Sequence, residues 1–92
     1  MVYVISYDLQ EPNDTNEDYE RIIKTIKNSF TWCHLQKSVW LVRSDSSAKE
    51  IRDILTPLIK NGDELFVARL QGNWATVGLG DRRNNWLHKS IF

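Results

Sequence analysis

The chain has 92 residues, of which 41% are apolar, and its twelve Lys and Arg residues balance twelve Asp and Glu residues. This length allows one domain with one modest core, and the apolar content excludes a disordered chain. Zero net charge argues against strong non-specific nucleic-acid binding, although it leaves room for a local basic face.

The chain shows no signal for a membrane or for secretion. No apolar run is long enough to cross a bilayer, and the N-terminus lacks the basic segment and cleavage site of a secretory signal. Cys33 is the single cysteine, so no internal disulfide can form. These features favour a reducing cytoplasm and no membrane partner.

The first predicted element is a strand over residues 2–7 that ends at Asp8. Its almost unbroken apolar and aromatic run is typical of a strand at the centre of a sheet. Because side chains alternate across a strand, Asp8 should share a face with Val4 and Ser6. A carboxylate in this place is either a turn former that caps local backbone amides or a metal ligand.

Polar residues then predict a loop in which Asp14 or Thr15 caps the next helix. Apolar residues at helical spacing predict that amphipathic helix over residues 16–29. Two strands follow at residues 32–35 and 38–43, joined by a tight turn. In these strands, the tryptophans are predicted core or dimer contacts rather than base-stacking platforms.

A second amphipathic helix should begin after Ser47, which can form a capping box with Glu50. Pro57 lies inside this helix and should kink it or tighten its last turn. Gly62 follows near the usual left-handed stop. A third clear strand is predicted over residues 65–70.

The C-terminal part of the pattern is less regular. Residues 74–79 predict an extra strand, weakened by Gly78. Residues 80–85 predict a polar turn, and residues 86–92 predict a short terminal helix or an arm.

This order predicts the α+β ferredoxin-like fold, βαββαβ with a four-stranded antiparallel sheet, an extra C-terminal strand and a short terminal helix or arm. We expect one domain over residues 1–92, with its core at 1–71 and the C-terminal strand and tail at 72–92. Two helices would cover one face of the sheet. The apolar residues left on the other face would be buried in a dimer.

The chain resembles the small CRISPR-associated spacer-adaptation subunit, the partner of the CRISPR integrase, and the related virulence-associated protein D toxins. The residues that carry the resemblance are Tyr7-Asp8 at the end of an apolar first strand, the strand segment 36–42 and the strand segment 62–70. An additional C-terminal strand completes the pattern, so that the resemblance spans roughly residues 1–79.

The resemblance implies a homodimer in which residues 74–79 cross to the partner's sheet. It also implies that Asp8 pairs with its symmetry mate around a divalent metal, with Ser38 as the polar residue that opens the third strand. Two carboxylates can hold Mg²⁺ with waters and activate one water against a phosphodiester. The implied activity is that of an endonuclease, with Asp8 as catalytic residue and metal ligand and Ser38 and Arg43 as neighbours of the phosphate. RNA and DNA remain open as substrates.

One departure from the family pattern favours a different function. The family carries a basic pair soon after the aspartate, whereas residues 11–18 here are acidic and Arg21 is the first cation. An acidic rim opposes the approach of phosphate. The alternative is a non-catalytic dimeric module that binds a protein or a nucleic acid through its sheet edges or its tail at residues 86–92.

Arg82 and Arg83 stand close in sequence to Trp86 and could form a patch that binds phosphate and stacks a base. The alternative is a solvated turn followed by an apolar anchor. Cys33 and His34 are adjacent, so in a strand they point to opposite faces and cannot ligate one ion.

Overall fold

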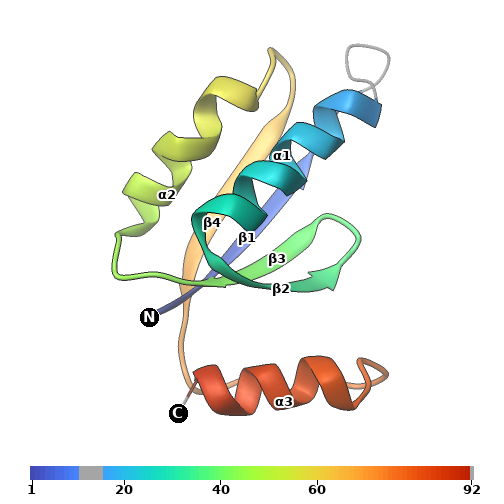
Figure 1. Ribbon diagram of the computed structural model, residues 1–92, viewed down its shortest axis with the longest axis vertical. Helices are drawn as coiled ribbons and strands as arrows, with labels where there is room; N and C mark the ends of the chain where they lie inside the picture. The colour runs from blue at the N-terminus through green and yellow to red at the C-terminus, as the bar shows by residue number, and fades with distance from the viewer. Residues whose placement is uncertain (11–15, 92) are drawn as a thin grey trace.

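The computed structural model describes residues 1–10 and 16–91. Its four strands pair antiparallel in the order β2-β3-β1-β4, so that the first strand is central, as its apolar run predicts. This is the predicted α+β architecture of ferredoxin-like type (Figure 1). The elements in chain order are β1 (Val2–Asp8), α1 (Asn16–Ser29), β2 (Thr31–Gln36), β3 (Val39–Arg43), α2 (Ala48–Leu55), the 3₁₀ helix η1 (Thr56–Leu58), β4 (Glu64–Leu70) and α3 (Asp81–Ser90).

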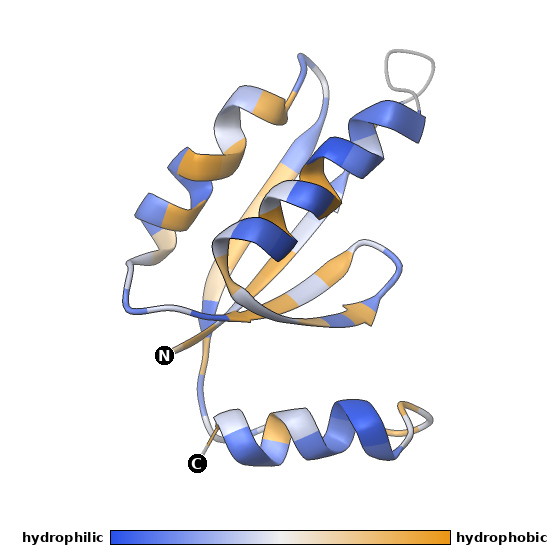
Figure 2. Cartoon of the chain, in the orientation of Figure 1, coloured by the Kyte–Doolittle hydropathy of each residue, from blue (hydrophilic) through white to orange (hydrophobic). Residues whose placement is uncertain are grey.

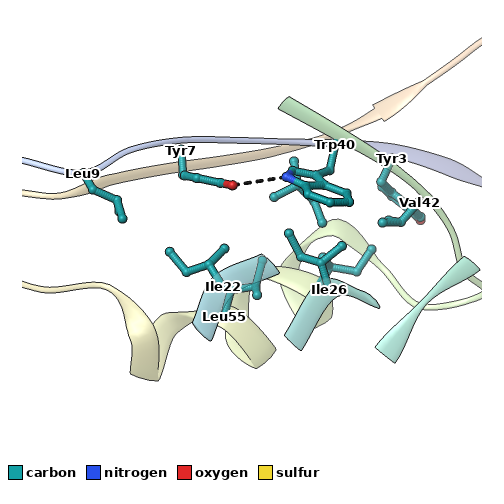
Figure 3. Packing of buried hydrophobic residues seen from close by; sticks show 10 residues of the cluster. Tyr3, Tyr7, Leu9, Ile22, Ile26, Trp40, Val42 and Leu55 are labelled. Carbon is teal, nitrogen blue, oxygen red and sulfur yellow. Dashed lines mark hydrogen bonds between the residues drawn. The ribbon is translucent and has the colours of Figure 1, made fainter. Parts of the chain in front are cut away.

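Helices α1 and α2 cover one face of the sheet and close the larger core (Figure 1). The apolar faces of both helices point toward the strands, and the indole of Trp40 lies at the centre of the packed layer (Figures 2 and 3). Burial of this apolar surface is the main force that holds the helices on the sheet. The buried members of this first core are Tyr3, Ile5, Tyr7, Leu9, Ile22, Ile26, Trp40, Val42, Ile51 and Leu55.

Local sequence signals set the ends of α2. The Oγ of Ser47 accepts a hydrogen bond from the Glu50 N–H at 3.1 Å, and a Glu50 carboxylate oxygen accepts one from the Ser47 N–H at 3.0 Å. This confirms the predicted capping box. Pro57 lies in η1, so the last turn is tightened to a 3₁₀ helix, and Gly62 adopts a φ of 94° in the turn that follows. The predicted cap of α1 at Asp14 or Thr15 lies outside the described residues.

The other face of the sheet is partly covered by the chain's own C-terminal segment. Leu87 on α3 is buried against Val2, Leu41 and Cys33, and α3 lies beside β2, apart from α1 and α2 (Figure 1). This second core also holds the partly buried residues Val4, Leu35, Leu70, Trp74, Leu79, Trp86 and Ile91. The side chain of Phe66 on β4 is left 62% exposed. One chain therefore buries part of the face that the sequence analysis expected a dimer to cover.

The two predictions for residues 74–85 are wrong in this chain. Residues 71–80 form no strand but an irregular connection, in which Gly78 and Gly80 take φ values of 81° and 82° that break an extended path. The polar stretch after Gly80 starts α3 at Asp81, so it is not a turn. Among the described residues, no helix has the length and apolar character needed to cross a membrane.

Candidate metal and nucleic-acid site

Asp8 lies at the end of the central strand with its side chain exposed. Within residues 1–10 and 16–91, its carboxylate has no hydrogen bond or ion pair. Asp63 instead performs the local capping, because its two carboxylate oxygens accept from the Gln10 N–H at 2.8 Å and the Lys60 N–H at 2.9 Å. Among the described residues the local capping role thus belongs to Asp63, and the choice between turn former and metal ligand for Asp8 stays a prediction.

Glu64 lies directly opposite Asp8 on β4. Directly opposed residues of an antiparallel pair hold their Cβ atoms about 5 Å apart. The next pair along the same face is Ser6 with Phe66, and the four residues line an open hollow of about 360 Å³. Two carboxylates and a hydroxyl are the oxygen ligands that Mg²⁺ prefers.

A complete cation site is not formed by the described residues of one chain, which contain no group of three or more His, Cys, Asp or Glu side chains able to hold a metal. Mg²⁺ takes six oxygens and usually keeps several waters. Asp8 and Glu64 fit this chemistry as part of a ligand set. The remaining oxygens must come from water, from a phosphate or from a second copy of the chain.

Ser38 lies at the same end of the sheet as Asp8. Its carbonyl accepts a hydrogen bond from the Tyr7 N–H at 3.2 Å, which holds the β2–β3 turn beside the end of β1. Arg43 lies at the opposite end, where it pairs with Val2. Six residue steps of about 3.3 Å separate Val2 from Asp8, or about 20 Å along the strand. Within one chain, Ser38 can therefore join Asp8 and Arg43 cannot.

The acidic segment of residues 11–18, which runs into the first turn of α1, includes one carboxylate that does not add to an acidic rim. Asp18 is buried and pairs with the guanidinium of Arg21, and its second oxygen lies 2.9 Å from the Lys60 Nζ. This carboxylate joins α1 to the end of the α2 region and does not face an approaching phosphate. Residues 11–15 of the acidic segment lie outside the described residues.

Arg82 and Arg83 occupy the first turn of α3, at the edge of the sheet formed by β2. Arg83 donates from Nε to the Leu79 carbonyl and from Nη1 to the Leu35 carbonyl, both at 2.8 Å. Arg82 is exposed and has no ion pair among the described residues. Strand β3 lies between β2 and β1, so the arginines at the edge of β2 are separated from Asp8 on β1. The predicted site residues therefore occupy three separate places: Asp8 with Ser38, Arg43 alone, and the two arginines of α3.

Burial decides the state of two titratable side chains near these places. It raises the pKa of the Cys33 thiol, an effect that the charges of Arg83 and Arg82 partly offset. It also raises the pKa of the Tyr7 hydroxyl, although the hydrogen bond from Trp40 acts in the opposite direction. Cys33 is therefore a protonated packing residue rather than a nucleophile. It lies on the α3 side of β2 while His34 stacks on Trp40 on the other side, as the strand alternation predicts.

Sequence reasoning missed Glu64 as the neighbour of Asp8. The available signal was the antiparallel order of the fold, in which the start of β4 must lie beside the end of β1. It also missed that Lys27 of α1 lies near the first turn of α3, since 55 residues separate Lys27 from Arg82 and no pattern connects them.

Comparison with known families agrees with this geometry. The model of the family described as CRISPR associated protein Cas2 matches residues 1–76, a range that contains the whole sheet, both helices of the first core, and Asp8, Ser38 and Glu64. Helix α3 lies beyond the match. The relation to the virulence-associated protein D toxins stays a prediction. A match over more than half of the sequence, on the predicted fold, shows that this chain belongs to the CRISPR associated protein Cas2 family.

Proposed function

We propose that this protein is a CRISPR adaptation subunit that acts as a homodimer and a Mg²⁺-dependent endonuclease, cleaving RNA or DNA. The observation that carries the proposal is the exposed Asp8 carboxylate, which has no hydrogen bond to any described residue and lies directly opposite Glu64 at the end of the central strand. An exposed aspartate with a second carboxylate opposite it fits the role of a metal ligand.

The dimer is supported by the part of the sheet face that α3 leaves uncovered. Phe66 is 62% exposed on the same face as Asp8, and Ser6 is its cross-strand neighbour. A second copy related by a two-fold axis would cover this ring with the same surface of its own sheet, as in most homodimers. Pairing through this face brings the two Asp8 side chains toward one site, which supplies the ligands that one chain lacks.

The residues of this end of the sheet have separate roles in the proposal. The carboxylates of Asp8 and Glu64 hold the metal, and the Ser38 hydroxyl donates a hydrogen bond to a phosphate oxygen. The metal, once bound, supplies charge at the phosphodiester and a water of lowered pKa. The Tyr7 N–H, through its bond to the Ser38 carbonyl, keeps the β2–β3 turn in position for this contact.

The test is a cleavage assay with Mg²⁺ or Mn²⁺ on single- and double-stranded RNA and DNA. Asp8→Ala should abolish cleavage with the fold intact by circular dichroism, and Glu64→Gln should reduce it. Asp45→Ala is the matched control, because Asp45 is an exposed aspartate outside this hollow. Cleavage that survives Asp8→Ala would assign the activity to a contaminant and overturn the proposal.

The second candidate function is a non-catalytic dimeric module that binds a protein or a nucleic acid through its sheet edges or its C-terminal segment. The incomplete ligand set of the described single chain and the zero net charge favour it. A ligand stabilises a protein only by binding its native state, so this module should melt at the same temperature with and without Mg²⁺ or Mn²⁺. A metal-dependent rise in the melting temperature, lost in Asp8→Ala, would decide for the nuclease.

A further inference from the structure

A hollow of about 700 Å³ lies at the free edge of β2, well away from the hollow that contains Asp8. Its walls come from the end of α1, from β2 and from the first turns of α3. The last of these lies beyond the residues that the family model matches. The residues that matter for its chemistry are Lys27, Trp32, His34, Arg82, Arg83 and Trp86.

The hollow is locally basic in a chain of zero net charge. It gathers Lys27, Arg82 and Arg83 against the single carboxylate of Asp81. Lys27 and Arg82 are exposed, and neither has an ion pair with any described residue. Two cations from different helices that line one hollow and lack carboxylate partners among the described residues create a local positive potential that attracts an anion.

Arg83 has a different role, because its guanidinium is already engaged. It donates to the carbonyl of Leu35, and the β2–β3 register shifts between His34 and Gln36, so that Leu35 is a bulged residue. Bulges occur preferentially at sheet edges and next to functional sites, where they redirect a side chain. Arg83 thus fixes the wall of the hollow and leaves Lys27 and Arg82 to meet the ligand.

Aromatic rings form the other wall. The imidazole of His34 stacks on Trp40 with 3.9 Å between ring centroids and 3° between planes, and His34 is itself an exposed residue that lines the hollow. Its Nε2 lies 3.2 Å from the Lys37 carbonyl, which can only accept, so Nε2 carries a hydrogen and the ring orientation is fixed. The Nζ of Lys27 lies 4.8 Å from the centre of the Trp32 ring, which places a cation next to this wall.

We propose that this hollow binds one nucleotide unit of a single-stranded nucleic acid, with its phosphate at Lys27 and Arg82 and its base stacked on His34. Cations that follow the backbone and aromatic rings that stack bases are the combination by which single strands are held. The volume of about 700 Å³ lies within the range of sites that bind a small ligand. An acidic peptide would use the cations but leave the aromatic wall without a stacking partner. A free nucleotide shares the same chemistry and is separated from a strand by experiment.

The test is fluorescence anisotropy with a labelled twelve-nucleotide single strand, as RNA and as DNA, on the full chain without divalent metal. The variant Lys27→Gln with Arg82→Gln should weaken binding by about tenfold or more. The matched control is Lys24→Gln with Lys89→Gln, which removes the same charge from the same two helices outside the hollow and should change affinity less than about threefold. The slope of log affinity against log salt should fall by about 0.7 for the first pair, since the pair holds one phosphate and each single-strand phosphate contact contributes about 0.7.

The stacking contact has its own test. His34→Ala should weaken binding by about fivefold or more and His34→Phe should restore it, because base stacking contributes about 1–3 kcal/mol and needs a ring rather than an imidazole. Adenosine monophosphate serves as competitor to distinguish a strand from a free nucleotide. If it displaces the labelled strand at the same total nucleotide concentration as an oligonucleotide does, the hollow is a site for free nucleotides and the strand is overturned as its ligand. If only longer oligonucleotides displace the labelled strand, the strand is supported.

Equal loss of affinity in Lys27→Gln with Arg82→Gln and in Lys24→Gln with Lys89→Gln would overturn the proposal. Equal binding by wild type, His34→Ala and His34→Phe would also overturn it. Binding at this hollow is independent of the proposed nuclease activity. Asp8→Ala should retain this binding, and Lys27→Gln with Arg82→Gln should retain any Mg²⁺-dependent rise in melting temperature. The proposal for this hollow and the proposal for the Asp8 site can therefore each be refuted without refuting the other.

Discussion

Asp8 on β1 and Glu64 on β4 face each other directly across the antiparallel pair, and the side chains of both are exposed. Like charges in this position repel each other when no cation lies between them. The repulsion is an electrostatic cost that the fold carries at one end of its central strand. Under the function proposed above, a cation bound between the two carboxylates would turn this cost into an attraction and would link the stability of the protein to metal binding.

The first prediction follows from this repulsion. Without divalent metal, Glu64→Gln should raise the melting temperature by roughly 1–4 °C, because relief of one like-charge pair contributes a few tenths of a kcal/mol. With saturating Mg²⁺ the order should reverse, since the wild type gains a ligand that the variant holds less well. The measurement is thermal unfolding followed by circular dichroism, in chelator and in Mg²⁺. A difference of the same sign and size in both solutions would contradict a metal site, and Asp45→Asn serves as the control for a general effect of removing one negative charge.

The second prediction concerns the hydrogen bond inside the first core. The Trp40 indole N–H donates to the Tyr7 hydroxyl at 3.1 Å, and both side chains are buried (Figure 3). Tyr7→Phe leaves that donor without a partner and should destabilise the fold by about 1–3 kcal/mol. Urea unfolding measures the change.

The same substitution changes the pH dependence. Burial holds the pKa of Tyr7 above its ordinary value of 10.0. A group whose pKa is raised by folding contributes stability that is fully present below its unfolded pKa and lost as the pH rises through the folded pKa. The wild type should therefore lose stability above about pH 10, and Tyr7→Phe should lose less over the same interval. An identical slope in both proteins above pH 10 would mean that Tyr7 does not titrate with unfolding.

The sequence predicted the sheet, the two helices of the first core and the capping box because each depends on local signals. The alternation in β1, the apolar spacing of α1 and the Ser47–Glu50 pair are short-range, and tertiary packing supports them here. The C-terminal prediction failed for the opposite reason. Residues 74–79 contain strand-forming side chains, but Trp74 and Leu79 pack against the second core and the positive φ of Gly78 breaks the extended path between them.

The candidate site was only partly visible in the sequence. Asp8 could be identified from its place after a buried strand. The placement of Glu64 opposite Asp8 depends on the register between β1 and β4, which the sequence alone does not determine. The separation of Arg43 from Asp8 depends on the antiparallel pairing of β1 with β3, which places Arg43 beside Val2. Asp18, predicted as part of an acidic rim, lies inward because Lys60 reaches it from 42 residues away.

The third prediction concerns this buried carboxylate. Asp18 is 3% exposed, whereas its partners Arg21 and Lys60 are 57% and 45% exposed. Solvent screens the two cations, so we expect about 1–3 kcal/mol of destabilisation for Asp18→Asn rather than the larger loss of a fully buried pair. Lys60→Gln should cost less than Asp18→Asn, because Arg21 continues to pair with the carboxylate. Urea unfolding of the two variants checks this order, and a larger loss for Lys60→Gln would contradict it.

The fourth prediction uses Cys33 as a reporter for the docking of α3. Cys33 is buried beneath Leu87, and burial holds the pKa of its thiol above the ordinary value of 9.0. A disulfide reagent should therefore modify the thiol slowly at pH 8, since only the thiolate reacts. Leu87→Ala removes a buried side chain from the second core, at a cost of about 2–4 kcal/mol, and should accelerate the reaction by loosening α3.

Ile54→Ala is the control for this reporter, because Ile54 is 42% exposed on α2, far in the fold from the second core. It should leave the rate of thiol modification unchanged. Acceleration in Leu87→Ala without loss of the far-ultraviolet circular dichroism of the sheet would show that α3 opens as a unit, separately from the first core. If both variants accelerate equally, global unfolding exposes Cys33, and α3 is an integral part of the cooperative fold.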